Sequence, residues 1–170
     1  SEHPKLEFHS IGMYEPDFQT MFGERYKFID GSANFPTFVN IWREEIKEAG
    51  IGLCPLHTSF FAQAKSSIKW KEYSAGYCAT IASNVKPYSP DIQNGVTGFL
   101  CSTEEEWYNA MTELINNEGR RKQMAKNAHE EVLKKHNAKE NWRKYKAFFE
   151  RIYTPKIIAD RDVMFTKLVK

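Results

Sequence analysis

The side chains of this sequence that are best suited to chemistry lie where a loop leads into a short predicted helix. Lys65, Ser66 and Ser67 stand at the start of that helix. Free backbone N–H groups and the positive end of the helix dipole meet there, and both attract anions such as phosphate. Lys65, Lys69 and Glu72 recur at helical spacing, so they lie on one face. That face offers cations to a phosphate and a carboxylate to a sugar hydroxyl.

The helix is predicted over residues 66–75 and is stopped by Gly76. Three apolar runs surround it, at residues 51–56, 78–83 and 98–101, and each is bounded by Gly, Pro, Ser or Asn, as buried strands are. A strand, a loop, a helix and a second strand in this space form a βαβ unit, so these strands are expected to be parallel. The loop that leaves the first strand then meets the helix N-terminus, where an anion would bind.

The order and spacing of these segments resemble a known family. Residues 71–76 (KEYSAG), 79–83 (ATIAS) and 93–100 (QNGVTGFL) are similar to the patterns "EA.A.G.PV.AS" and "dG..G.L" in retaining glycosyltransferases of the group 1 type. Those enzymes are built from two Rossmann-like domains, and the patterns lie in the C-terminal, donor-binding one. The downstream residues that also fit are Glu106 and Trp107, then Arg120, Arg121, Ala125 and Ala128. The resemblance covers roughly residues 4–153.

The resemblance implies roles for individual residues. Glu72 would hold the ribose hydroxyls of the nucleotide, which suits the two oxygens of a carboxylate. The residues expected at the donor phosphates are Lys65, Ser66, Ser67 and Lys69, and those expected near the donor sugar or base are Pro87, Tyr88, Ile29, Asp30 and Gly31. At Ala64 the sequence departs from the family, which often carries a first Glu eight positions before the second. We therefore assign the contact to the transferred sugar, and any catalytic role, to no residue.

Each of these residues also has an ordinary structural interpretation. Glu72 is equally a solvated helix glutamate that pairs with Lys69 or Lys71. The segment from Lys65 to Ser67 is equally a common helix cap. A Pro-rich loop such as the one at Pro87 is frequent without any function. The family resemblance favours the donor-binding interpretation for Glu72. Both interpretations stay open for Lys65, Ser66 and Ser67, and the ordinary one is favoured for the loop at Pro87.

The rest of the chain extends the same architecture. Predicted strands at residues 6–11 and 26–29 precede the βαβ unit, and a helix that begins near Pro36 carries Phe38, Ile41, Trp42, Ile46 and Ala49 at helical spacing. Strands that alternate with helices predict an α/β fold with a Rossmann-like, doubly wound parallel sheet and C-terminal helices. By resemblance this is one half of a two-domain glycosyltransferase fold.

The predicted domain organisation follows from the same resemblance. Residues 1–154 form a nucleotide-sugar-binding domain, and residues 155–170 form a tail that crosses to an N-terminal domain outside this sequence. In the family, a further strand and helix with an Arg and a Lys for the diphosphate precede this region. We therefore expect a fragment that transfers no sugar by itself.

Three helices are predicted after residue 101. The first begins with a capping box, either Ser102 with Glu105 or Thr103 with Glu106. The residues predicted to face the core are Trp107, Met111 and Leu114 in the first helix, Met124, Ala128 and Val132 in the second (118–136), and Trp142, Tyr145, Phe149 and Ile152 in the third (138–153). Pro155 ends the last helix.

Composition narrows the class of protein. With 41% hydrophobic residues among 170, the chain has enough apolar surface for a core. The net charge of +2 gives no field that demands nucleic acid as a partner. Three cysteines without metal-ligand spacing indicate buried thiols in a reducing compartment, so we expect a cytoplasmic protein without a bound metal. No run of 18 apolar residues predicts a transmembrane helix.

The predicted function is donor binding in a glycosyltransferase that moves a sugar from a UDP-, GDP- or dTDP-sugar to a glycan or lipid-linked acceptor, without a cofactor. The alternative is a non-catalytic α/β interaction module that shares only the fold. The basic helices at residues 119–146 are either a solvated face or a surface for an anionic membrane.

Overall fold

The computed structural model describes residues 3 and 5–152, apart from the side chain of Glu140. By their internal contacts the residues divide into two compact units, Ser1–His129 and Glu130–Lys170. Each unit is considered by itself. The predicted boundary at residues 154 and 155, the crossing tail and Pro155 lie outside the described residues.

The first unit begins with a two-stranded parallel sheet, β1 (Phe8–Ile11) and β2 (Tyr26–Ile29), linked by α1 (Pro16–Phe22) and a 3-10 turn, η1 (Gly23–Arg25). The centre of the Phe8 ring lies 4.9 Å from the centre of the Phe18 ring and 5.0 Å from that of the Phe22 ring. Helix α1 therefore packs on β1 through aromatic contacts. Helix α2 (Phe35–Glu48) follows, and the side chain of Asn34 caps it by accepting from the Thr37 amide.

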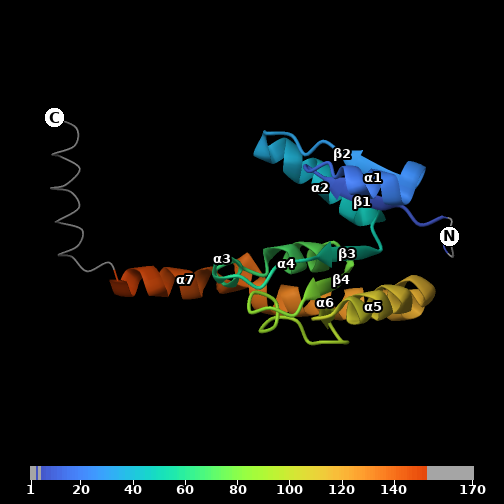
Figure 1. The fold of residues 1–170 in the computed structure, drawn as a ribbon. Helices are drawn as coiled ribbons and strands as arrows, with labels where there is room; N and C mark the ends of the chain where they lie inside the picture. The colour runs from blue at the N-terminus through green and yellow to red at the C-terminus, as the bar shows by residue number, and fades with distance from the viewer. Residues whose placement is uncertain (1–2, 4, 153–170) are drawn as a thin grey trace. The chain divides into compact units, whose positions relative to one another are not determined.

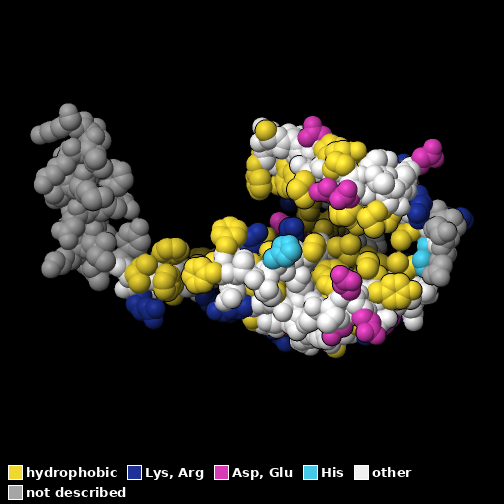
Figure 2. All heavy atoms as spheres, viewed as in Figure 1, with side chains coloured by type: hydrophobic (Ala, Val, Ile, Leu, Met, Phe, Trp, Pro, Cys, Tyr) yellow, Lys and Arg dark blue, Asp and Glu magenta, His cyan; other side chains and the backbone are white. Residues whose placement is uncertain are grey.

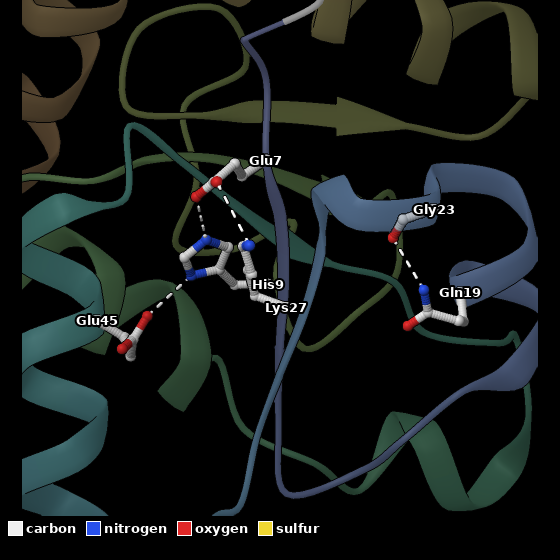
Figure 3. A network of polar contacts seen from close by, with 6 residues as sticks. All are labelled: Glu7, His9, Gln19, Gly23, Lys27 and Glu45. Carbon is white, nitrogen blue, oxygen red and sulfur yellow. Dashed lines mark hydrogen bonds and ion pairs between the residues drawn. The ribbon is translucent and has the colours of Figure 1, made fainter.

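A charged network joins β1, β2 and α2 (Figure 3). His9 Nδ1 lies 2.9 Å from a carboxylate oxygen of Glu45, and His9 Nε2 lies 3.2 Å from one of Glu7. Lys27 Nζ lies 3.9 Å from the other oxygen of Glu7. Partial burial alone would lower the pKa of His9, but the hydrogen bonds and charges of Glu45 and Glu7 outweigh it and raise that pKa.

Because the folded pKa of His9 is raised, its contribution to stability is complete below the ordinary value of 6.5 and is lost as pH rises through the folded value. We expect His9→Gln to lower the free energy of unfolding by up to about 1 kcal/mol in mildly acidic buffer, and by less above neutrality, since the ring is partly exposed. Urea unfolding at both pH values measures this. Lys47→Gln, which breaks the exposed Lys47–Glu44 pair on α2, is the control. An equal loss for His9→Gln at both pH values would contradict the assignment.

A second parallel sheet has the order β3 (Ile51–Cys54), β4 (Ala79–Ser83), β5 (Phe99–Cys101). The predicted βαβ unit is confirmed, with α3 (Phe60–Gln63) and α4 (Ile68–Ala75) between β3 and β4. The α/β class is also confirmed, but the five strands of the described residues form two sheets of two and three strands instead of one. Apolar runs predict that strands exist, whereas the pairing of backbone groups between strands is decided by tertiary packing.

Helices cover both faces of the β3–β4–β5 sheet (Figure 1). Alternate residues of the central strand point to opposite faces, as in any strand. Ile81 belongs to the core that α5 (Glu104–Asn116) and α6 (Glu118–His136) build, and Gly52, the neighbour of Thr80 across the ladder, meets Tyr73 of α4 on the other face. The buried core on the α5 and α6 side consists of Ala79, Ile81, Cys101, Ala110, Leu114, Met124 and Ala125. The fold is thus doubly wound around this sheet.

The structure chooses between the two predicted capping boxes. Thr103 Oγ1 accepts from the Glu106 amide at 3.2 Å, and a carboxylate oxygen of Glu106 accepts from the Thr103 amide at 3.3 Å. At the other end of α5, Arg121 donates to the carbonyl of Leu114 at 2.6 Å. Arg120 donates to Glu113 at 3.0 Å and to the carbonyl of Gly95. Both arginines are therefore used to join α5, α6 and the loop before β5.

The second unit contains the end of α6 and α7 (Ala138–Ile152). The side-chain amide of Asn141 donates to the carbonyl of Lys135 at 2.8 Å, which fixes the turn between them. The prediction that the apolar side of the last helix faces a core is wrong. The exposed fractions are 50% for Trp142, 63% for Tyr145, 53% for Phe149 and 42% for Ile152. Helical spacing correctly placed these residues on one face, but no described element of the second unit covers it.

Candidate functional site

The three parallel strands β3, β4 and β5 end at one edge of their sheet, and polar groups tie these ends together. The amide of Leu56, after β3, donates to Ser83 Oγ at the end of β4 at 2.8 Å. The amide of Asn84 donates to the carbonyl of Cys101 at the end of β5 at 2.9 Å. In open α/β sheets, ligands bind outside this carboxyl edge.

Helix α4 starts beside this edge, two residues later than predicted, at Ile68. The amide of Lys71 donates to the carbonyl of Ser67 at 3.1 Å, which closes the first helical turn. The amides of Ile68, Lys69 and Trp70 precede that bond, so helix geometry leaves them without an intrahelical partner and directed out of the N-terminus. They can donate to an anion placed there.

Ser67 is buried, with 2% of its surface exposed, and its hydroxyl donates to a carboxylate oxygen of Asp91. Lys71 Nζ lies 3.5 Å from the same oxygen. The Ser67 hydroxyl therefore binds the protein's own loop, and only its backbone remains directed to the helix start. Asp91 was not singled out from the sequence, because a lone Asp in a Pro-rich loop has no pattern that identifies its partner.

Three of the predicted phosphate ligands are exposed: Lys65, Ser66 and Lys69. The ammonium group of Lys65 lies 5.2 Å from the centre of the Phe61 ring, a cation–π distance. Phe61 belongs to the short helix α3, which Ser59 caps by accepting from the Ala62 amide. The role of Lys65, Ser66 and Lys69 at the donor phosphates stays a prediction.

Glu72 lies on α4 and is half-buried. Burial raises the pKa of its carboxyl group above 4.5, and the charge of Lys69 opposes part of that rise. The charges of both residues also act on the thiol of Cys54 at the end of β3, where Lys69 lowers its pKa and Glu72 raises it. Burial raises the pKa of Cys54 to about 12, so it remains a neutral thiol. A carboxyl group whose pKa is shifted by burial and by a charged neighbour is a candidate for a binding site.

Pro87 and Tyr88 lie in the loop between β4 and β5, and both are buried. The hydroxyl of Tyr88 shares a hydrogen bond with the thiol of Cys54, and burial raises the pKa of Tyr88 to about 12. The Tyr88 side chain therefore holds the loop against β3 and does not project to solvent. This contact was missed from the sequence, where Cys54 was interpreted only as a small core residue.

Ile29, Asp30 and Gly31 lie at the end of β2, in the other sheet. Asp30 accepts from the Ser32 amide at 3.2 Å. A Cβ atom on Gly31 would lie 2.9 Å from the Cα of Gly12, so this position excludes any side chain. These contacts explain the Asp-Gly turn structurally, and the role of the three residues near the base stays a prediction.

The described residues contain neither a metal-binding cluster nor a membrane-spanning helix. In residues 3 and 5–152, no group of three or more His, Cys, Asp or Glu side chains is placed to hold a metal ion. Within the same part of the chain, no helix is long and apolar enough to cross a membrane. All three cysteines are buried and free, as predicted.

The parallel sheet with helices on both faces, and with its carboxyl edge beside a helix N-terminus, is similar in fold to one half of solved GT-B glycosyltransferases. The structure of Anabaena HepE in complex with UDP is similar with a TM-score of 0.64 and 15% identity, over 88% of this chain and 42% of that one. A point mutant of S. aureus TarM in complex with Fondaparinux, alpha-GlcNAc-glycerol and UDP is similar with a TM-score of 0.64 and 12% identity, over 87% of this chain and 30% of that one. The C-terminal domain of the glycosyl transferase group 1 family protein LpcC from Francisella tularensis is similar with a TM-score of 0.55 and 22% identity, over 69% of this chain and 57% of that one.

The chain spans between 30% and 57% of the length of these three solved chains. At identities of 12% to 22%, the likeness establishes the fold. No family model and no curated protein matches the sequence. The predicted resemblance is thus confirmed as a shared half-domain fold.

Proposed function

We propose that this chain is the donor-binding half of a glycosyltransferase, which takes a sugar from a nucleotide diphosphate donor to a glycan or lipid-linked acceptor. One observation supports the proposal: the half-buried carboxyl group of Glu72 interacts electrostatically with Lys69 and with Cys54 at the end of β3, on a helix whose N-terminal amides are open. Lys65 precedes that helix in the chain. HepE and TarM, which share the fold, were solved with UDP, so a uridine diphosphate donor is the first candidate.

The proposed mechanism assigns one task to each group. The amides of Ile68 and Lys69, with the ammonium groups of Lys65 and Lys69, hold the diphosphate and stabilise the charge that builds on it as the sugar leaves. Glu72 accepts hydrogen bonds from two ribose hydroxyls. By resemblance to the retaining group 1 type, we expect this route to need no metal and to retain the configuration of the sugar. Transfer itself requires an acceptor-binding half, so this chain alone binds donor and transfers nothing.

The proposal predicts that UDP binds and that Glu72→Gln weakens the binding. Loss of hydrogen bonds to a charged group costs about 1–3 kcal/mol. Calorimetric titration with UDP, GDP and dTDP measures the affinity and identifies the base. Glu105→Gln, an exposed glutamate of α5, is the matched control and is expected to bind like the original chain. Equal affinities for Glu72→Gln and Glu105→Gln would refute the role of Glu72.

The same titration has a pH dependence with a defined sign. Because burial raises the pKa of Glu72, its carboxylate is lost at a higher pH than that of an ordinary glutamate. Binding that needs the carboxylate therefore weakens as pH falls through the raised pKa. The affinity of the Glu72→Gln variant should not show this weakening as pH falls.

A second candidate is a non-catalytic α/β interaction module. Ala64 favours it, because a carboxylate that the resembled family often carries is missing there. Absence of binding by all three nucleotides at millimolar concentration would support the module over the enzyme. Detectable sugar transfer by the isolated chain would contradict both the module and the predicted inactivity of this half.

A further inference from the structure

Helix α7 presents an exposed aromatic stripe. Trp142, Tyr145, Phe149 and Ile152 are spaced by three, four and three residues, which places them on one helix face. Phe148 borders the stripe and is 48% exposed. Figure 2 shows yellow side chains gathered over α7 with dark-blue ones beside them. Large aromatic side chains on a face without cover indicate a surface that meets something apolar.

Basic residues line the same helix. The Lys and Arg residues of α7 are Lys139, Arg143, Lys144, Lys146 and Arg151, against two glutamates, Glu140 and Glu150. The Arg143 guanidinium lies 5.7 Å and the Lys146 ammonium 6.0 Å from the centre of the Trp142 ring, and the Arg151 guanidinium lies 5.7 Å from that of Phe148. Lys146 also lies 3.6 Å from Glu150.

Helical geometry places these charges relative to the stripe. At about 100° per residue, Lys139 and Lys146 fall on one side of Trp142, and Lys144 falls beyond Phe148 on the other side. Cations therefore border the apolar face on both sides. In a helix of this kind, the aromatic side chains insert at the boundary between lipid headgroups and acyl chains. The cations on either side then lie at the level of the lipid phosphates.

We propose that α7 binds the surface of an anionic lipid bilayer, with the stripe inserted between the headgroups. The helix of 15 residues is about 22 Å long, shorter than the ~30 Å hydrocarbon layer, so it lies along the surface. Charge favours an anionic lipid surface, because α7 carries five cations against two glutamates and three of its lysines border the stripe. This inference rests on α7 alone and does not depend on nucleotide binding.

Sedimentation with vesicles tests the proposal on the whole 170-residue chain. We expect binding to phosphatidylcholine vesicles that contain phosphatidylglycerol, much weaker binding to phosphatidylcholine alone, and a fall in binding as salt is added. The double variant Trp142→Ser/Phe149→Ser should partition at least about tenfold less, because it removes two of the inserted rings. The matched control, Phe35→Ser/Tyr108→Ser, removes two aromatic side chains that are also exposed, outside α7, and should bind unchanged.

Tryptophan fluorescence gives an independent signal. Of the four tryptophans, Trp142 is the exposed one, whereas Trp70 is fully buried and Trp42 and Trp107 are partly buried. A blue shift on adding anionic vesicles should disappear in Trp142→Phe while sedimentation persists. Three results would each overturn the proposal: no binding to either vesicle, equal binding to both, or a stripe that drives lipid-free self-association in analytical ultracentrifugation. The last result would assign α7 to a protein interface.

Discussion

Replacement of Trp70 by alanine should lower the free energy of unfolding by about 3–5 kcal/mol, the range for a fully buried large aromatic side chain. Trp70 lies on α4 and none of its surface is exposed. Its indole N–H donates to the carbonyl of Thr97 at 3.0 Å, and the Thr97 hydroxyl accepts from the Gln93 amide at 2.9 Å. Trp70→Ala removes both the buried ring and the anchor of the loop before β5, and urea unfolding followed by circular dichroism measures the loss.

Two variants separate the causes. Trp70→Phe keeps most of the apolar volume but leaves the Thr97 carbonyl without the indole donor, so we expect a smaller loss of about 1–3 kcal/mol. Trp142→Ala is the matched control, since this tryptophan is 50% exposed on α7, and it should change stability by less than about 0.5 kcal/mol. If Trp70→Ala and Trp142→Ala cost the same, the buried position of Trp70 is wrong.

Gly52→Ala is expected to destabilise the chain by about 1–3 kcal/mol through overpacking. Gly52 is a buried residue of β3, and a Cβ atom there would lie 2.5 Å from the Tyr73 ring at its attachment point. That part of the ring is fixed close to the α4 backbone, so it cannot swing away as a flexible chain end does. Thermal unfolding of the variant measures the effect.

A second substitution tests the cause of this loss. Tyr73→Leu removes the ring that the added methyl group would meet, so the double variant Gly52→Ala/Tyr73→Leu should recover stability relative to the sum of the single changes, with a coupling of about 0.5–3 kcal/mol. Gly119→Ala on α6 is the control, since its Cβ would lie 3.6 Å from Asn117, an ordinary contact. There alanine should be neutral or stabilising by up to about 1 kcal/mol. Strictly additive effects at positions 52 and 73 would contradict the predicted clash.

Local patterns in the sequence predicted most elements of this fold. The helix at residues 118–136 was placed as observed, because its apolar residues recur at helical spacing and Met124, Ala128 and Val132 are buried. The strand predicted at residues 78–83 differs from β4 by one residue. Sequence order, with a helix between two apolar runs, also predicted the parallel βαβ unit that carries Lys69 and Glu72 on its helix.

Contacts between distant residues could not be predicted in the same way. Asp91 accepts from Ser67, 24 positions away in the sequence, and Tyr88 is still farther from Cys54 along the chain. Because no local sequence pattern includes both residues of either pair, neither contact could be predicted. Only the tertiary structure shows that the Ser67 hydroxyl binds Asp91 and that the Tyr88 hydroxyl binds the Cys54 thiol. For the same reason, the predicted single sheet proved to be two.

The sequence by itself determined which helices and strands form and which residues share a face, because both depend on spacing along the chain. Only the tertiary structure decided which faces are covered. Helical spacing placed Leu114 of α5 and Trp142 of α7 each on an apolar face, yet Leu114 is fully buried and Trp142 is half exposed. Burial depends on whether another element packs against that face, and no local pattern encodes the presence of that element.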